Sequence, residues 1–172
     1  MTREQVRHSV HDSPLGPLTL RAFDGVLDGL YMTEHRHGPS DEALGGLVAD
    51  AVPAAREQLA AYFAGELRDF DLEVALRGTE FQQRVWAALR EIPFGETCSY
   101  TELAAAIGSP TAVRAVGLAN GKNPVSIVVP CHRVVGANGS LTGYGGGTDR
   151  KRALLELEGA AVVRGEPVLF AP

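Results

Sequence analysis

The sequence predicts an α+β protein with a small N-terminal α/β domain, residues 1–78, and a mostly helical C-terminal domain, residues 79–172. Two observations predict this class. Strand-like runs dominate the first part, and at Arg77-Gly78-Thr79 the pattern of apolar residues changes to that of helices. With 172 residues, of which 45% are hydrophobic and 22% charged, the chain can form one ordinary domain or two small ones and bury a core.

The N-terminal domain is expected to contain a β-hairpin. Two strand-like runs flank Asp24-Gly25, a dipeptide that suits a tight hairpin turn. The other expected elements are a loop, a helix that ends at Gly65, and a half-exposed strand of alternating apolar and acidic residues. The ranges are 18–22 and 26–32 for the hairpin, 39–50 for the loop, 53–64 for the helix and 69–76 for the last strand. None of these segments carries a chemical motif, so this domain is interpreted as a scaffold.

Three consecutive capped helices are expected in the C-terminal domain. Thr79 caps the first, and Ser99 with Glu102 forms a capping box for the second. Thr111 caps the third, which runs to about residue 120. The second and third are joined by a tight glycine-containing turn, which makes them a helix-turn-helix candidate. By itself, this pattern fits either DNA binding or ordinary helix packing.

One side of the third helix carries small residues, Ala112, Ala115 and Ala119. Such a face lets the backbone approach another surface, either a neighbouring helix or the floor of a DNA groove. The net charge of −5 argues against a nucleic-acid partner, but it is −6 in residues 1–78 and +1 in residues 79–172. The C-terminal half can therefore face DNA, although without strong electrostatic attraction.

The reactive residues are expected at Cys131 and His132, which follow a β-branched run and a proline. A free cysteine is mostly protonated at neutral pH, and a histidine that takes its proton, directly or through one water, makes it a better nucleophile. The other cysteine, Cys98, has no histidine or cation beside it. Cys98 is therefore interpreted as a structural residue.

Glu158 is the candidate that orients His132. It ends a helix over 149–158 and falls between Leu154 and Leu155 at helical spacing, on the apolar face. The helix macrodipole disfavours an anion in the last turn, so a carboxylate there suggests a specific partner. Two interpretations stay open at this point: a Cys–His–Glu relay, or an exposed glutamate paired with a lysine or arginine.

We expect a cytoplasmic protein with no membrane contact and no bound metal. Two cysteines fit a reducing compartment, and no apolar run approaches the roughly 20 residues of a membrane span. The first residues lack the apolar core of a signal peptide. The histidines of the N-terminal part have no metal-ligand spacing with a cysteine, so structural zinc is not expected.

The segment 123–134, Asn-Pro-Val-Ser-Ile-Val-Val-Pro-Cys-His-Arg-Val, resembles the active-site signature of the methylated-DNA–protein-cysteine methyltransferases, also called O6-alkylguanine-DNA alkyltransferases. The likeness covers much of the C-terminal half and is looser before it. Further matching motifs are Phe81…Val85-Trp86, Pro93-Phe-Gly95, Ser99-Tyr100, Arg114-Ala-Val-Gly117, Gly143-Tyr144-Gly145-Gly146, Ser13-Pro14-Leu-Gly16 and Tyr62-Phe63-Ala-Gly65. The resemblance implies an RNase H-like N-terminal domain and a winged helix-turn-helix, whose wing the Asn138-Gly139 turn would shape.

The resemblance also implies catalytic roles. Cys131 would be the alkyl acceptor, and His132 with Glu158 would form the relay that generates the thiolate through a bound water. Asn123 is similar to the residue that braces the active-site turn by hydrogen bonds. Tyr100 is similar to the tyrosine that stabilises or protonates the departing guanine and helps rotate its phosphate.

Family members dock the third helix in the minor groove of double-stranded DNA, with the damaged base flipped out. Arg114 resembles the arginine that fills the gap in the base stack, and Tyr144 with Gly145 matches the loop that closes the base pocket. The expected DNA-binding residues are Arg114, Ala112, Ala115 and Gly117.

Two features depart from some relatives. Gly145 stands where others have a serine next to O6, so only its backbone N–H could donate there. The cysteines and histidines that hold zinc in some N-terminal domains are also missing.

No cofactor is expected, and we expect a monomer in solution. Cooperative assembly along DNA is left open.

The expected activity is direct-reversal DNA repair. The alkyl group of O6-alkylguanine would pass irreversibly to Cys131, once per protein molecule, because nothing in the sequence suggests a means of cleaving the resulting thioether. The range of alkyl groups and any activity on O4-alkylthymine are left open. Two alternatives are a cysteine hydrolase, for which no oxyanion-hole motif is evident, and a lesion-recognising or regulatory DNA-binding protein without transfer activity.

Overall fold

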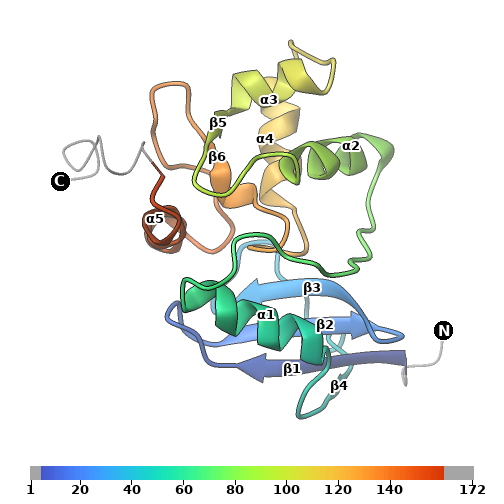
Figure 1. The fold of residues 1–172 in the computed structure, drawn as a ribbon. Helices are drawn as coiled ribbons and strands as arrows, with labels where there is room; N and C mark the ends of the chain where they lie inside the picture. Colours follow the sequence, from blue (N-terminus) through green and yellow to red (C-terminus); the bar gives the residue numbers. More distant parts are fainter. Residues whose placement is uncertain (1–4, 161–172) are drawn as a thin grey trace. The chain divides into compact units, whose positions relative to one another are not determined.

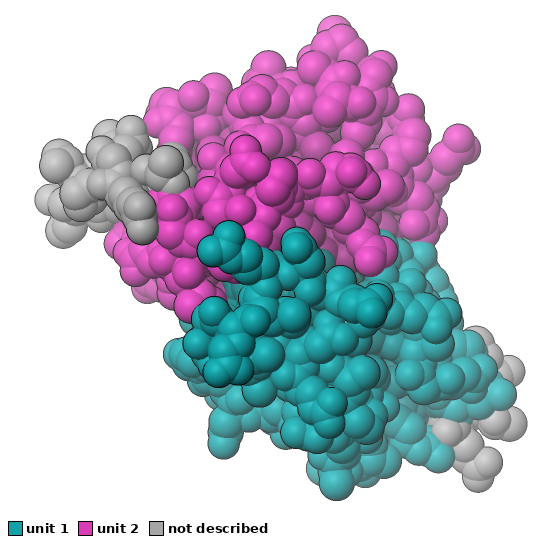
Figure 2. All heavy atoms as spheres, viewed as in Figure 1, with its two compact units in different colours: residues 1–77, 124–128 teal, residues 78–123, 129–172 magenta. Residues whose placement is uncertain are grey.

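The computed structural model describes residues 5–160 and has the expected α+β composition (Figure 1). Within the described residues there are five α-helices and a four-stranded sheet. Contacts divide the chain into unit 1, residues 1–77 and 124–128, and unit 2, residues 78–123 and 129–172 (Figure 2). The tail 161–172, whose order the sequence left open, lies outside the described residues. That 1–78 and 79–172 are separate domains stays a prediction.

Unit 1 is built on a sheet of strand order β3-β2-β1-β4. The expected hairpin forms, with β2 (Leu18–Phe23) antiparallel to β3 (Val26–Met32) and a register shift at Arg21/Ala22. Strand β1 (Val6–His11) pairs antiparallel with β2 and was not predicted, because its polar residues mask the strand pattern. The expected loop 39–50 contains the two-residue β4 (Gly46–Leu47), which is parallel to β1.

The predicted helix forms as α1 (Pro53–Phe63), with proline at its first position. Its buried residues Ala55, Leu59 and Tyr62 belong to the core of unit 1. Leu59 lines a shallow hollow together with Leu18 of β2. The helix therefore covers a face of the sheet, as the ribbon shows (Figure 1).

The prediction of a strand at 69–76 is wrong. Among the described residues, the only bridge that this segment forms is an isolated one between Val74 and Leu27. The backbone of Asp71 is already paired, since its N–H donates to Oε1 of Gln58 and its carbonyl accepts from Nε2 of the same side chain. The backbone here therefore pairs with a side chain of α1 and not with a neighbouring strand.

The segment Pro124–Val128 belongs to unit 1, although the rest of its surroundings in the sequence belong to unit 2. The N–H of Leu30 in β3 donates to the carbonyl of Pro124 over 2.9 Å, and Leu30 forms a parallel bridge with the buried Val125. The chain is therefore attached to β3 just before it reaches Cys131.

Unit 2 contains the predicted capped helices. Thr79 forms a capping box with Gln82 at the start of α2 (Glu80–Leu89), and Ser99 forms one with Glu102 at the start of α3 (Tyr100–Ala106). The remaining elements are β5 (Cys98–Ser99), α4 (Val113–Gly121), the 3-10 turn η2 (Cys131–Arg133), β6 (Val134–Val135), which pairs in parallel with β5, and α5 (Thr148–Leu157).

The expected cap at Thr111 is wrong. Ala112 occupies the N-cap position of α4 without a side-chain hydrogen bond, because its N–H donates to the Ser109 carbonyl and closes a turn before the helix begins. The alanine face is also divided. Ala119 is buried, and its carbonyl accepts from Nε1 of Trp86 over 2.9 Å, whereas Ala115 is exposed. The C-terminal part of this face therefore packs against α2.

A turn forms at Asn138-Gly139, where Gly139 has a φ of +84° and Gly136 pairs with Ser140. No strand follows this turn within the described residues, so the wing stays a prediction. Of the helices in residues 5–160, none has the length and apolar character needed to cross a membrane.

Candidate active site

The turn that carries Cys131 is held by backbone and side-chain hydrogen bonds. The Cys131 N–H donates to the Val129 carbonyl over 2.8 Å, and Nδ2 of the buried Asn123 donates to the same carbonyl over 2.8 Å. Asn123 thus braces this turn, in the position expected of it. Four residues before Cys131, Ile127 has a φ of +71°, a strained conformation for a β-branched residue that costs about 1–3 kcal/mol. The surrounding structure therefore fixes the path of the backbone here.

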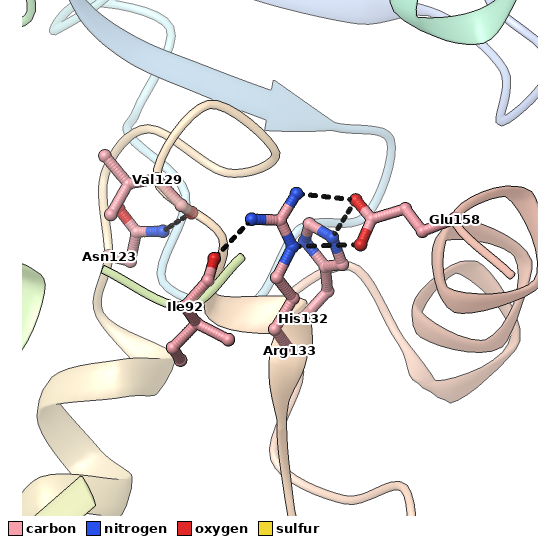
Figure 3. A network of polar contacts seen from close by, with 6 residues as sticks. All are labelled: Ile92, Asn123, Val129, His132, Arg133 and Glu158. Atoms are coloured by element: carbon pink, nitrogen blue, oxygen red, sulfur yellow. Dashed lines mark hydrogen bonds and ion pairs between the residues drawn. The ribbon is translucent and has the colours of Figure 1, made fainter. Parts of the chain in front are cut away.

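His132 and Glu158 are in direct contact. His132 Nε2 lies 2.8 Å from Glu158 Oε2, and both side chains are fully buried (Figure 3). Glu158 is the C-cap residue of α5. The predicted contact of Glu158 with His132 is confirmed and its side chain is not exposed, whereas the relay to Cys131 stays a prediction.

Arg133, to which the sequence analysis gave no role, completes this network. Its Nε donates to Glu158 Oε1 over 2.9 Å, and its Nη2 donates to Oε2 over 3.0 Å (Figure 3). Its Nη1 donates to the Ile92 carbonyl over 2.7 Å. This bidentate contact fixes the orientation of the carboxylate that also contacts His132.

The charges of this network determine the tautomer of His132. Burial opposes the charge on Glu158, but the hydrogen bonds that His132 and Arg133 donate, together with the charge of Arg133, outweigh it and lower the pKa of Glu158 to about 2. Burial lowers the pKa of His132, which keeps the ring neutral. An ionised carboxylate only accepts hydrogen bonds, so Nε2 carries the ring proton and Nδ1 has the free lone pair. Nδ1 is buried and has no hydrogen-bond partner among the described residues. The ring is thus prepared to accept a proton at Nδ1.

The surroundings of Cys131 contain Tyr100 and Lys151. Cys131 is 3% exposed. Burial raises the pKa of Tyr100 to about 12 and lowers that of Lys151 to about 8. The negative charge of the nearby Cys131 thiolate raises both pKa values. The Tyr100 hydroxyl and Lys151 Nζ each donate to the carbonyl of Thr142 over 2.8 Å. A phenol and an ammonium group therefore meet at one carbonyl beside the thiol.

The residues expected to contact DNA have different surroundings. Arg114 and Ala115 are exposed on α4, and Ala112 is half-buried at its start. Gly117 lies against Tyr100, because a Cβ built on it would be 3.9 Å from the tyrosine ring. In the loop before α5, Tyr144 is buried and Gly145 half-buried.

Cys98 has the properties expected of a structural residue. It is half-buried in β5, and burial, with a contribution from Glu102, raises the pKa of its thiol to about 11. Almost none of it is thiolate at neutral pH.

The sequence contained a signal for the missed Lys151. Lys151, Leu154, Leu155 and Glu158 follow the i, i+3, i+4, i+7 spacing of one helix face, and all four are buried. A lysine at the opposite end of the apolar face that carries Glu158 could therefore have been predicted to be buried. Asn120, also missed, follows Val116 by one turn on the buried side of α4.

Comparison with known proteins identifies the family. The chain is 59% identical over 153 residues to the methylated-DNA–protein-cysteine methyltransferase of Mycobacterium tuberculosis, covering 89% of this chain and 92% of the relative. The chain belongs to this family. A family model described as "6-O-methylguanine DNA methyltransferase, DNA binding domain" matches residues 80–160. A family member from Methanosarcina acetivorans is 49% identical, covering 89% of this chain and 98% of the relative.

Solved structures of family members share the fold. The O6-methylguanine methyltransferase of M. tuberculosis superposes with a TM-score of 0.83 at 58% identity, covering 90% of this chain and 93% of that one. The M. tuberculosis protein in complex with DNA gives a TM-score of 0.85 at 57% identity, covering 91% and 96%. The O6-methylguanine-DNA methyltransferase of Pyrococcus kodakaraensis gives 0.66 at 28% identity, covering 90% and 99%.

Proposed function

We propose that this protein repairs DNA by transferring the alkyl group of O6-alkylguanine irreversibly to Cys131. The observation that carries this proposal is the buried His132–Glu158 pair, whose Nδ1 is left as an acceptor on the residue next to Cys131. Membership of the methyltransferase family supports the same reaction. Residues 1–78 serve as the scaffold domain, with the RNase H-like fold that the family resemblance implies.

Proton removal is the first step of the proposed mechanism. His132 Nδ1 takes the proton of the Cys131 thiol through one water molecule, and Glu158 stabilises the resulting imidazolium at Nε2. Arg133 holds Glu158 in place, so the carboxylate does not turn away when the histidine becomes charged. Asn123 keeps the Val129 carbonyl, and with it the turn, in position.

In the second step, the thiolate attacks the saturated carbon bound to O6. A carbon–sulfur bond forms as the carbon–oxygen bond breaks, and the bonding electrons leave with the guanine. Tyr100, beside Cys131, donates a proton to this leaving group, and the proton that His132 took from the thiol then passes to the tyrosinate, so that both residues return to their neutral forms. The product is a thioether, and no residue described at this site provides chemistry to cleave it, so each molecule acts once.

DNA is bound through α3 and α4 as a winged helix-turn-helix in the minor groove. The carbon on O6 is inaccessible in a stacked duplex, so the nucleotide is flipped at a cost of a few kcal/mol. Arg114 fills the gap, and the exposed Ala115 with the half-buried Ala112 allows close approach to the groove. Because Cys131 is 3% exposed, the loop with Tyr144 and Gly145 moves to admit the base.

Stoichiometry and adduct position test this function together. The protein is incubated with excess duplex DNA containing radiolabelled O6-methylguanine, and the modified peptide is located by mass spectrometry. We expect one equivalent of label, carried as a methyl thioether on Cys131. Binding of the lesion without transfer would instead establish a recognition protein, and repeated turnover would establish a hydrolase or another catalytic enzyme.

Replacing Arg114 with alanine is expected to slow repair of duplex DNA by at least about tenfold, the effect of losing roughly 1.4 kcal/mol of stacking compensation. Reaction with free O6-benzylguanine needs no flipping and should keep its rate. Single-turnover rates on the two substrates provide the measurement. Lys122→Ala, at the other end of α4, removes the same charge and serves as the control. Equal losses on both substrates for Arg114→Ala would exclude a flipping role.

A further inference from the structure

Asn120 of α4 is a buried polar residue to which the mechanism above assigns no role. It is 1% exposed, and its Nδ2 lies 3.4 Å from the carbonyl of Cys131. Its side chain also hydrogen-bonds to the phenol of Tyr100, which lowers the pKa of Tyr100 against the larger opposite effect of burial. One amide therefore touches both the backbone of the nucleophile and the phenol beside it.

The hydrogen-bond pattern fixes the orientation of this amide. Nδ2 must face Cys131, because a carbonyl accepts hydrogen bonds and an amide oxygen there would be repelled. Oδ1 has no partner among the described residues, so the contact with Tyr100 is also made by Nδ2, through its second hydrogen. The Tyr100 oxygen accepts from Asn120, and its own hydrogen points to the Thr142 carbonyl.

A purely structural role explains this arrangement poorly. A buried amide oxygen without a partner costs about 1–3 kcal/mol. The Cys131 carbonyl already accepts the N–H of Val134, so the 3.4 Å contact is not needed to satisfy it. The contact that Asn120 alone provides is therefore the one to the phenol.

We propose that Asn120 is a positioning residue. Its N–H donates to the Tyr100 oxygen, so that the hydroxyl hydrogen is free to turn from Thr142 to the departing guanine. This inference rests on the proposed function. Lys151 makes the switch feasible, because its Nζ still donates to the Thr142 carbonyl after the tyrosine has turned away. As negative charge develops on the phenol oxygen during proton donation, the N–H of Asn120 stabilises it.

A double-mutant cycle tests the coupling to Tyr100. Asn120→Leu has a similar volume and no hydrogen-bond donor, and Asn120→Ala is the second variant; both are made in the wild-type and the Tyr100→Phe backgrounds. Thermal melting first identifies the variants that are folded. The rate of single-turnover transfer from O6-benzylguanine is then compared with the rate at which iodoacetamide alkylates Cys131, which requires a thiolate but no proton donor.

We expect Asn120→Leu to slow transfer from O6-benzylguanine roughly tenfold, the contribution of about one hydrogen bond. Its iodoacetamide rate should stay within about twofold of wild type, and in the Tyr100→Phe background the substitution should cause no further loss. Equal slowing of both reactions, or an undiminished loss without the Tyr100 hydroxyl, would overturn the positioning role. Failure of the wild-type protein to take up label from duplex DNA containing O6-methylguanine would instead refute the proposed function itself.

Discussion

Replacing Cys131 with alanine is expected to abolish uptake of the alkyl group completely. Among the residues that the structure describes at this site, Cys131 alone carries a thiol, and the neutral His132 is the next residue in the chain. The remaining thiol, Cys98, has a pKa that burial raises to about 11, so very little of it is thiolate at pH 7. Incubation with radiolabelled O6-methylguanine duplex, followed by counting of the protein-bound label, measures the effect.

Cys98→Ser is the matched control for this experiment. It removes the second sulfur and leaves the His132–Glu158 pair intact, so it should take up one full equivalent of label at the wild-type rate. Cys131→Ala should still bind duplex DNA, since α4 is unchanged. Label on the Cys131→Ala protein, located at Cys98 by peptide mass, would show that the acceptor has been assigned to the wrong sulfur.

Replacing Glu158 with glutamine is expected to reduce both the alkyl-transfer rate and the stability. A neutral amide neither orients His132 in one tautomer nor stabilises its charged form, and general-base catalysis of this kind contributes about 10²–10⁴-fold. The substitution also leaves Arg133, 6% exposed, without its counter-charge. Breaking a buried ion pair in this way costs about 3–5 kcal/mol. Single-turnover kinetics and urea unfolding at pH 7 measure the two effects.

The pH dependence of stability gives a second signature of Glu158. Although burial opposes its charge, its contacts with His132 and Arg133 lower its pKa from 4.5 to about 2. The folded protein therefore binds this proton less readily than the unfolded chain does. The resulting stabilisation is fully present above pH 4.5 and is lost as the pH falls from 4.5 toward 2.

Urea unfolding between pH 6 and pH 3 should accordingly show a steeper loss of stability for the wild type than for Glu158→Gln. Glu156→Gln is the matched control, because it removes an exposed carboxylate from the same helix. Its profile should follow that of the wild type. Parallel profiles for the wild type and Glu158→Gln would show that Glu158 is not held ionised by its partners.

Local rules predicted the parts of this structure that depend on neighbours in the sequence. The cap at Thr79 and the capping box at Ser99 were predicted because the groups that they bind lie three residues away. The burial of Glu158 followed from its place on an apolar helix face. Its contact with His132, 26 residues away, was predicted because a buried carboxylate requires a partner.

Features that depend on distant partners could not be predicted in this way. The segment 69–76 has a strand pattern, but Gln58 of α1 pairs with its backbone instead. The role of Arg133 depends on the carbonyl of Ile92, 41 residues away, as well as on Glu158. The second half of the alanine face was buried by Trp86, whose position relative to α4 the helical pattern does not specify.

The passage of residues 124–128 through unit 1 limits how this protein can be divided. A fragment that begins at residue 79 would contain Cys131 but would lack Leu30, the β3 residue to which Pro124 and Val125 are attached. The same restriction applies to chimeras. If the C-terminal half comes from another family member, the chimera must also contain a β3 strand that pairs with the segment preceding the cysteine of that half.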